Sequence, residues 1–479
     1  MKNIIILILI ILFPFTAYGY STGCSPVSGG TCYLCSADKT DISNAIAAAT
    51  AGDTIRVGAG SVSVGSWTIS KNLYIMGAAA PNAPSAGTTT WVTTVSQGLK
   101  FTSTGLTRFA YSSIDNSAGG GNGAIEFGSQ KRMDHLTVYT GGAHVFKIWN
   151  LVTNVVIDNC DFSEGRGISL GSSTGYTYWE NEDNFNPGTI GNVYIEDCTF
   201  GDSAVEVLDS NGGGSFIVRG STFNGGANIA AHGADSGLHS GGFYESYSNT
   251  FNASGDIAHV IRGGTAFLFN NTDNDGRTNF GKMVYQRSCW PCGGYSYTGE
   301  NASRCGDGTE AIDGYDDATG WLCKQQPGTG PNDTDGGYPG SRKPIYIWEN
   351  TASGSSSGQC ACGGDIADHV KANRDYYIDT GGQLTKATSA PTTCSTQYDA
   401  VWYDTDGDDC YDDGISCGGG GAETLYQCDG ANYQVYYTPY TYPHPLRGES
   451  TPTNTIQGVT IGNLKITEYI AYHREDGLR

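Results

Sequence analysis

The feature that most constrains the fold is a short strand-like pattern that recurs along the middle of the chain. An apolar stretch is followed by small or polar residues and then, in most copies, by Phe. The copies are Met133–Val138, Ile157–Phe162, Ile195–Phe200, Val218–Phe223, Tyr247–Phe251 and Phe269–Asp273. Their last residues are separated by 24, 38, 23, 28 and 22 residues. Such spacing, with occasional insertions, is typical of a parallel β-helix, in which each strand stacks ~4.8 Å from the equivalent strand of the previous turn.

The same alignment predicts two rows of side chains inside the helix. An apolar row is expected from Phe162, Phe200, Phe223 and Phe251. A second row of small or amide-bearing side chains is expected from Cys160, Cys198, Ser221, Asn249 and Asn271. Amides stacked at strand spacing can hydrogen-bond to one another or to the turn backbone. We therefore expect the two thiols to be buried packing groups rather than ligands.

An amphipathic helix is expected before the first strands. Within residues 40–49, apolar residues recur at helical spacing, with Thr40 or Asp41 as N-cap and Gly52 as the stop. We expect this helix to cap the open end of the β-helix, where unpaired strand groups would otherwise favour aggregation. The first strand is expected at Gly52–Val57.

Together, the helix, the strand Gly52–Val57, the segment Leu73–Gly77 and the repeated coils resemble the pectate-lyase-like right-handed parallel β-helix superfamily. The resemblance covers roughly residues 40–280 and implies the fold more strongly than any activity, because this architecture carries many functions. Later segments, such as Pro344–Asn350 and Tyr437–Leu446, resemble uncharacterised exported bacterial β-helix proteins. That second resemblance assigns no catalytic residues.

The two ends of the chain have a different composition. Residues 1–19, with a basic start and a short apolar run, are typical of a signal peptide, and residues 20–39 form a Cys-containing N-terminal segment. After the β-helix of residues 40–280, a disulfide-rich, irregular elaboration is expected over 281–446, followed by a strand segment or tail over 447–479. Ten of the 15 cysteines lie between Cys289 and Cys428, which indicates disulfides in an exported protein.

Charge narrows the set of partners. The net charge is −22, so phosphate backbones would be repelled and nucleic acid is not an expected partner. An anionic polysaccharide would also be repelled unless a bound cation bridged it to the protein. After the signal peptide, no segment is apolar enough to predict a membrane span. We therefore expect a secreted, periplasmic or cell-surface protein.

Polar residues collect after the expected inward positions of successive coils. Counting from the Phe residues brings the apolar positions Ile168, Val205, Ile229 and Ile257 into one row. Near this row, the candidate catalytic residues are Asp209, His232, Asp235, Glu245 and Arg262. Residues of this kind on a rigid scaffold are common places for binding or catalysis. The alternative is that each of them only hydrogen-bonds a turn and solvates the surface.

Two chemistries suit these residue types. A lyase of acidic polysaccharides must neutralise a uronate and remove the neighbouring proton; Asp209 and Asp235 could hold calcium, and Arg262 or His232 could be the base. A glycoside hydrolase would instead need two carboxylates flanking the bond, and Glu206, Asp209, Asp235 and Glu245 could supply them.

A second candidate site is an acidic loop near the C-terminus. Asp404, Asp406, Asp408 and Asp412 occupy positions 1, 3, 5 and 9 of a calcium-loop pattern. Position 12 is Ile415 instead of Glu, which excludes an EF-hand but allows a looser calcium loop held by cysteines. The alternative is a solvated acidic turn.

The sequence therefore predicts an all-β, polysaccharide-binding protein that cleaves an acidic polysaccharide by cation-assisted β-elimination. Two alternatives stay open. The first is a non-catalytic, adhesin-like surface protein that binds glycans, and the second is a glycoside hydrolase with paired carboxylates.

Overall fold

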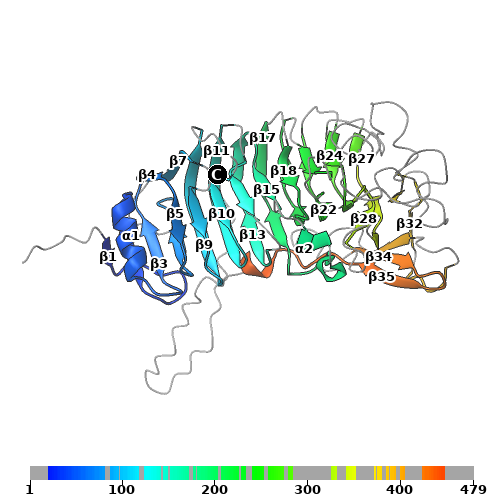
Figure 1. Ribbon diagram of the computed structural model, residues 1–479, viewed down its shortest axis with the longest axis horizontal. Helices are drawn as coiled ribbons and strands as arrows, with labels where there is room; N and C mark the ends of the chain where they lie inside the picture. Colours follow the sequence, from blue (N-terminus) through cyan, green and yellow to red (C-terminus); the bar gives the residue numbers. More distant parts are fainter. Residues whose placement is uncertain are drawn as a thin grey trace, which may run out of the picture.

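The computed structural model describes a core of stacked strands and part of the C-terminal region (Figure 1). The described residues are 20–80, 87–95, 98–117, 123–141, 144–148, 152–171, 176–179, 181–202, 206–225, 228–233, 240–252, 257–274, 279–283, 325–331, 341–351, 370, 372–373, 375–379, 384–387, 389–394, 400–404 and 423–447. They form an all-β structure with long parallel sheets, which is compatible with a β-helix-like fold.

The larger sheet, sheet A, has 20 strands and consists of two parallel rows. The first row contains β2 (Cys32–Cys35), β3 (Thr54–Val57), β6 (Tyr74–Met76), β9 (Thr107–Asn116), β11 (Lys131–Thr140), β13 (Val155–Asp158), β16 (Val193–Glu196), β19 (Phe216–Arg219), β22 (Phe243–Tyr247), β25 (Thr265–Phe269), β30 (Ile345–Trp348) and β31 (Tyr376–Ile378). The second contains β4 (Gly60–Val64), β7 (Thr89–Thr93), the later halves of β9 and β11, β14 (Asp161–Glu164), β17 (Thr199–Asp202), β20 (Thr222–Phe223), β23 (Thr250–Phe251) and β26 (Thr272–Asp273). An edge strand, β1 (Tyr20–Thr22), pairs antiparallel with β2.

The smaller sheet, sheet B, has nine strands that are all parallel. They are β5 (Trp67–Ile69), β8 (Leu99–Phe101), β10 (Ile125–Phe127), β12 (Phe146–Ile148), β15 (Ile168–Leu170), β18 (Glu206–Ser210), β21 (Asn228–Ala231), β24 (Ile257–Ile261) and β27 (Asn279–Met283). Along the chain, strands of sheet B follow strands of sheet A in turn. One apolar core is enclosed between the sheets, and every second strand residue contributes to it.

Both predicted rows of side chains are confirmed. Phe162, Phe200, Phe223 and Phe251 are buried, and successive rings stack with centroids 4.9, 4.7 and 4.8 Å apart. In the second row, Ser221 N donates to Asn249 Oδ1 at 2.9 Å and Asn249 N donates to Asn271 Oδ1 at 3.1 Å. Asn271 N then donates to Asn350, which the sequence alignment had missed. Cys160 and Cys198 are buried free thiols.

A left-handed backbone position separates the two rows of sheet A in successive turns. The residues at this corner are Tyr111, His135, Asn159, Asp197, Gly220, Ser248, Asn270 and Glu349, all with φ between 51° and 60°. Asn, Asp and Gly adopt this conformation more readily than other residues. This requirement explains why small or polar residues recur before the inward Cys, Ser or Asn.

The expected register of sheet B was wrong in two turns. Ile168 pairs with Leu208 rather than Val205, and Ile229 pairs with His259 rather than Ile257. Ile168 lies six residues after Phe162, whereas its partner Leu208 lies eight residues after Phe200. The sequence analysis assumed turns of nearly equal length. A turn that is longer by two residues leaves the alternation of inward and outward side chains unchanged, so the pattern alone does not reveal it.

The expected N-terminal helix is α1 (Lys39–Ala48), but its N-cap is Asp38 instead of Thr40 or Asp41. Asp38 Oδ1 accepts hydrogen bonds from the backbone N–H groups of Thr40 and Asp41. The helix packs on β2 and β3 through Ile42 and Ala45, at the end of the stack that is blue in Figure 1.

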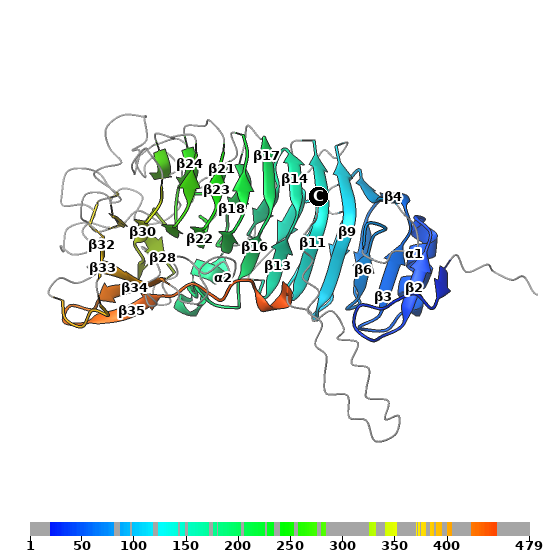
Figure 2. The same cartoon turned by 180° about the vertical axis from the view of Figure 1, so that it is seen from behind.

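Beyond residue 280, where the sequence suggested irregular structure, β30 and β31 extend the first row of sheet A. A four-stranded sheet of β32 (Thr385–Lys386), β33 (Ala400–Asp404), β34 (Glu423–Cys428) and β35 (Tyr433–Tyr437) packs on the outer face of sheet A. From β35, the strap, residues 438–447, runs back along the molecule to β13 and ends in η2 (Pro445–Arg447) (Figure 2).

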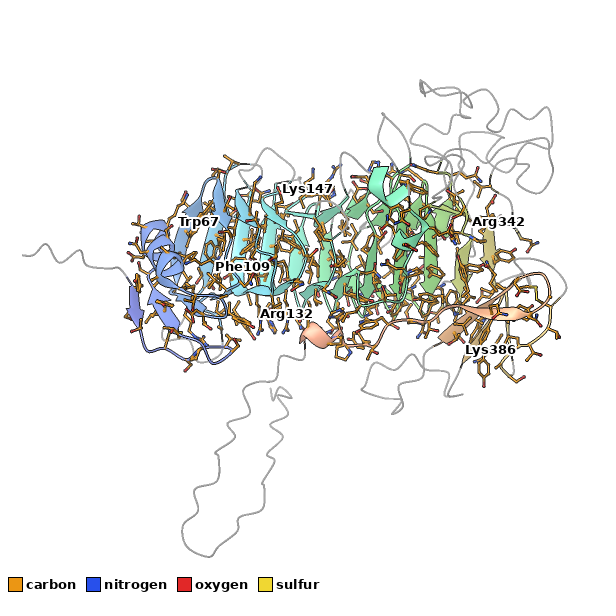
Figure 3. The ribbon with its side chains drawn as sticks, turned by 60° about the horizontal axis from the view of Figure 1, so that its bottom comes forward. Trp67, Phe109, Arg132, Lys147, Arg342 and Lys386 are labelled. Carbon is orange, nitrogen blue, oxygen red and sulfur yellow. A yellow bond between two sulfur atoms is a disulfide. The ribbon has the colours of Figure 1, made fainter. Side chains whose placement is uncertain are left out.

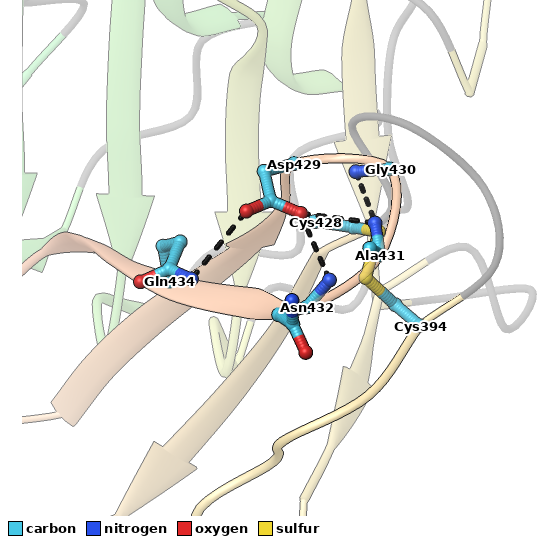
Figure 4. The surroundings of a disulfide bond; sticks show 7 residues. All are labelled: Cys394, Cys428, Asp429, Gly430, Ala431, Asn432 and Gln434. Atoms are coloured by element: carbon cyan, nitrogen blue, oxygen red, sulfur yellow. Dashed lines mark hydrogen bonds between the residues drawn. A yellow bond between two sulfur atoms is a disulfide. The ribbon is translucent and has the colours of Figure 1, made fainter.

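Disulfides join Cys24 to Cys32 and Cys394 to Cys428. The second lies beside a tight turn, where Oδ1 of Asp429 accepts hydrogen bonds from the backbone N–H groups of Ala431 and Asn432 (Figure 4). Among the described residues, no helix has both the length and the apolar character that crossing a membrane requires.

Candidate functional site

The outer face of sheet B carries a row of charged and polar side chains. Cross-strand pairing aligns Lys100, Glu126, Lys147, Ser169 and Asp209 on successive strands from β8 to β18. Side chains alternate between the two faces of a strand, so these residues point away from the apolar core that their neighbours line. Figure 3 shows Lys147 on the upper side of the stack and Arg132, on sheet A, at the lower side near η2.

Asp209 and His232 form the centre of this site. Asp209 lies on β18, and His232 directly follows the neighbouring strand β21, where its backbone N–H donates to Ser210 O at 2.7 Å. This backbone pairing brings the imidazole over the carboxylate. Nε2 of His232 lies 3.0 Å from Oδ1 of Asp209, and their side chains are 14% and 9% exposed.

The pKa of Asp209 reflects two opposing effects. Burial alone would raise the pKa of the carboxyl, but contact with His232 and the charges of His144 and Arg262 lower it below the ordinary value. Asp209 is therefore ionised at neutral pH. A fixed carboxylate of this kind orients an imidazole and stabilises its protonated form.

Arg262 supplies a buried positive charge next to this pair. It follows β24, and its backbone N–H donates to Ala231 O at 2.9 Å. Nη2 forms an ion pair with Oε1 of Glu206 at 3.6 Å, a distance beyond that of a hydrogen bond. In the described part of the chain, the Nε and Nη2 groups of Arg262 are buried and donate no hydrogen bond. Such a guanidinium is suited to an anionic acceptor, which it can bind with two parallel hydrogen bonds.

Three further polar residues gather around the pair, and sequence reasoning had missed them. Lys147 comes from β12, and its ammonium is within electrostatic reach of Asp209. His144 precedes β12. Burial has the largest effect on its pKa, followed by the charges of Asp209 and Arg166. Lys147 could have been predicted from the alternation of inward and outward residues along β12, once the register of that strand was known. Nothing in the local sequence marks His144 or Arg166.

The candidate residues do not all come together. Asp209, His232 and Arg262 lie in one cluster, as the sequence analysis expected. Glu245 does not join them, because β22 belongs to sheet A and the carboxylate points outward beneath β35. Asp235 lies outside the described residues.

The acidic loop is almost entirely outside the described part of the chain. Asp404 is the last residue of β33, paired with Glu423 on β34, while Asp406, Asp408 and Asp412 lie outside the described residues. The calcium loop therefore stays a prediction.

A second set of buried charges lies on the outer face of sheet A. The first-row register aligns Asp134, Asp158, Glu196 and Arg219 on β11, β13, β16 and β19. The strap covers this row: Arg219 donates to Thr441 O at 2.8 Å, and Arg447 donates to Glu196 Oε2 at 2.9 Å. These charges are paired with one another and with the strap, so they serve to hold the C-terminal segment in place.

In the comparisons, no family model, no curated protein and no solved structure matches this chain. The cluster around Asp209 and His232 is therefore the feature of this chain that bears most directly on function.

Proposed function

We propose that this chain is an exported polysaccharide lyase that binds an acidic polysaccharide along the outer face of sheet B. Cleavage by β-elimination would take place at the Asp209–His232 pair. One observation carries the proposal: beside this pair, the buried guanidinium of Arg262 has two N–H groups that donate no hydrogen bond within the described residues. A buried cation with open donors favours an anionic, oxygen-rich ligand.

The proposed architecture is a right-handed parallel β-helix of the pectate-lyase-like kind, capped by α1. Support comes from the two parallel sheets, whose strands alternate along the chain and share one core. The stacked Phe row and the amide row are features of such a helix. The two disulfides of the described residues, and the apolar run near the N-terminus, support export.

The elimination needs three events at one sugar residue. Arg262 binds the uronate carboxylate, which increases the acidity of the neighbouring C–H bond. His232 removes that proton, the electron pair forms a carbon–carbon double bond, and the bond to the glycosidic oxygen on the next carbon breaks. The leaving oxygen takes a proton from water. The products are an unsaturated sugar end and a new hydroxyl end, so no oxidant or reductant is required.

Asp209 assists this step as a positioning residue. Its carboxylate lies 3.0 Å from His232 and fixes which ring nitrogen faces it. When His232 gains the proton, the adjacent negative charge stabilises the imidazolium. Lys147, two strands from Asp209 in the same outward row, adds positive charge for neighbouring uronates.

The calcium ion expected between Asp209 and Asp235 stays a prediction, because Asp235 lies outside the described residues. Asp209 already faces His232 and lies near Arg262, whose positive charge disfavours a second cation. In the described part of the chain, no three His, Cys, Asp or Glu side chains are arranged to hold a metal ion. No step of the mechanism is therefore assigned to a metal.

The test is to incubate the purified protein with polygalacturonate, alginate and hyaluronate. A lyase releases an unsaturated product, which is followed by its ultraviolet absorbance. New reducing ends without that absorbance would indicate the hydrolase instead. Binding to a polymer without any cleavage would indicate the adhesin-like alternative.

Two variants connect the activity to the site. Arg262→Met should raise KM strongly, because the apolar side chain keeps much of the volume but loses the carboxylate contact. Lys100→Gln, on the same row but four strands from Asp209, is the matched control and should change KM much less. Equal effects of the two variants would contradict the assigned site.

A further inference from the structure

His144 lies in the same cluster but has no part in the mechanism above. It precedes β12, and only 2% of the residue is exposed. Burial has the largest effect on its pKa, and the charges with the next largest effects are those of Asp209, Arg166, Glu206 and His232. Backbone pairing places it there as well: Val145 N donates to Gly167 O at 3.0 Å and Gly167 N donates to Val207 O at 3.1 Å, so the preceding residues His144, Arg166 and Glu206 lie side by side in adjacent turns.

Neither ring nitrogen of His144 makes a hydrogen bond in the described part of the chain. Asp209, whose charge influences the pKa of His144 more than any other charge, lies 3.0 Å from Nε2 of His232 through its Oδ1. Burying two polar atoms without partners destabilises a folded protein, so native structures rarely retain such an arrangement without a use. Since no described residue completes these hydrogen bonds, both nitrogens are open to a bound ligand.

The protonation state indicates which ligand group is suitable. Burial lowers the pKa of His144 to about 4, so the imidazole is neutral near pH 7. A neutral imidazole offers one donor and one acceptor. A sugar hydroxyl also donates and accepts, whereas a carboxylate only accepts and is better bound by Arg262.

We propose that His144 is a specificity-determining residue that hydrogen-bonds a hydroxyl group of the sugar chain held at Asp209 and His232. This inference rests on the proposed polysaccharide binding. It assigns Arg262 to the acidic group and His144 to a neutral hydroxyl, so the site would reject polymers whose hydroxyls are blocked.

The test compares the wild-type protein with His144→Phe, which keeps a ring but removes both polar atoms. Calorimetric titrations use polygalacturonate, alginate and hyaluronate, each in native and chemically O-acetylated form. For the polymer that binds, the wild type should prefer the native form by ~10-fold or more, because a site built to bond a hydroxyl rejects analogues that lack it. His144→Phe should lose most of this preference, and its Kd for the native form should rise.

Thermal unfolding of the free proteins supplies a second readout. Since His144 makes no hydrogen bond within the described residues, His144→Phe should unfold at the same temperature as the wild type or higher. The control is His135→Phe on sheet A, which should leave both Kd values unchanged. A fall of several degrees in Tm with unchanged Kd would show a structural role and overturn the inference. If the wild type bound none of the polymers, the proposed function itself would fail, whereas normal binding by His144→Phe would refute only this inference.

Discussion

The hydroxyl of Tyr437 donates a hydrogen bond of 2.6 Å to Oε2 of Glu245, joining the end of β35 to the outer face of β22. The backbone N–H of Gly188 donates to the other oxygen, also at 2.6 Å. Burial, the dominant influence, raises the pKa of Glu245 to about 7, although both hydrogen bonds and the charge of Arg219 act to lower it. The contact that holds β35 against β22 therefore involves a carboxyl group that changes its protonation state near neutral pH.

The first prediction is that the contribution of Glu245 to stability decreases as pH rises from about 4.5 to about 7. The folded protein holds a proton on Glu245 over this range, whereas the unfolded chain has released it, so rising pH favours unfolding. The full difference is on the order of 3 kcal/mol in the free energy of unfolding. Denaturant titrations at pH 5 and pH 8 measure it. Glu245→Gln is neutral at both values, so the stability of the wild type relative to this variant should fall by that amount between the two pH values; a constant gap between the two proteins would rule out Glu245 as the source.

The second prediction concerns Arg219, a fully buried cation on β19. It donates to Glu196, to the hydroxyl of Tyr247 and to the backbone oxygens of Tyr440 and Thr441. Arg219→Met removes a positive charge that neutralises the buried carboxylate of Glu196, so it should lower the free energy of unfolding by about 3–5 kcal/mol. The strap should also become accessible, so limited proteolysis should cut within residues 438–447 first. Cleavage at the wild-type rate would contradict this role of Arg219.

The third prediction concerns the amide row. Asn249 is buried and bonds Val218 O, Ser246 Oγ and Asn271 Oδ1. Asn249→Ala should cost at least about 1–3 kcal/mol, because buried partners lose their hydrogen bonds. Asn252 is the matched control, since it also bonds to asparagines of adjacent turns but is exposed. Asn252→Ala should change stability by less than about 0.5 kcal/mol, and similar losses from both substitutions would be evidence against a special role of the buried row.

The fourth prediction tests whether Asp209 and His232 act as one unit. His232→Gln should lower kcat by about 10²–10⁴-fold, since the general base is lost. Asp209→Asn should lower kcat with little change in KM, because it removes the charge that stabilises the imidazolium. The double variant should be hardly slower than His232→Gln alone. Steady-state kinetics on the polymer that is cleaved give these values, and multiplicative losses would mean that the two residues act separately.

The fifth prediction concerns the acidic loop from Asp404 to Asp412. If it binds calcium, a chelator should lower Tm and added calcium should restore it, because a ligand bound to the folded state stabilises that state. The combined change Asp406→Asn and Asp408→Asn should abolish the calcium response. A Tm that is insensitive to both chelator and calcium would favour the solvated turn.

The repeat predicted the stacking of strands because its information is local. Most coils have an inward Phe and a small or amide residue at the bend, and the left-handed corner recurs in successive turns. Asn249, for example, could be placed from its own neighbours. The lengths of the turns between sheets are not constrained in this way, which is why Val205 and Ile257 were placed wrongly.

What the amino-acid sequence determined by itself is the β-rich stack, its two interior rows and its N-terminal helix, since all three depend on short-range periodicity and on burial of apolar side chains. Only the tertiary structure decided which polar residues meet. Cross-strand register brought His232 to Asp209 and Arg262 to Glu206, and added His144. Glu245 lies apart from them because its strand, β22, belongs to sheet A. Counting residues along the chain does not reveal which sheet a strand joins. Contacts between residues far apart in the chain depend on the path of every turn between them, and no local pattern records that path.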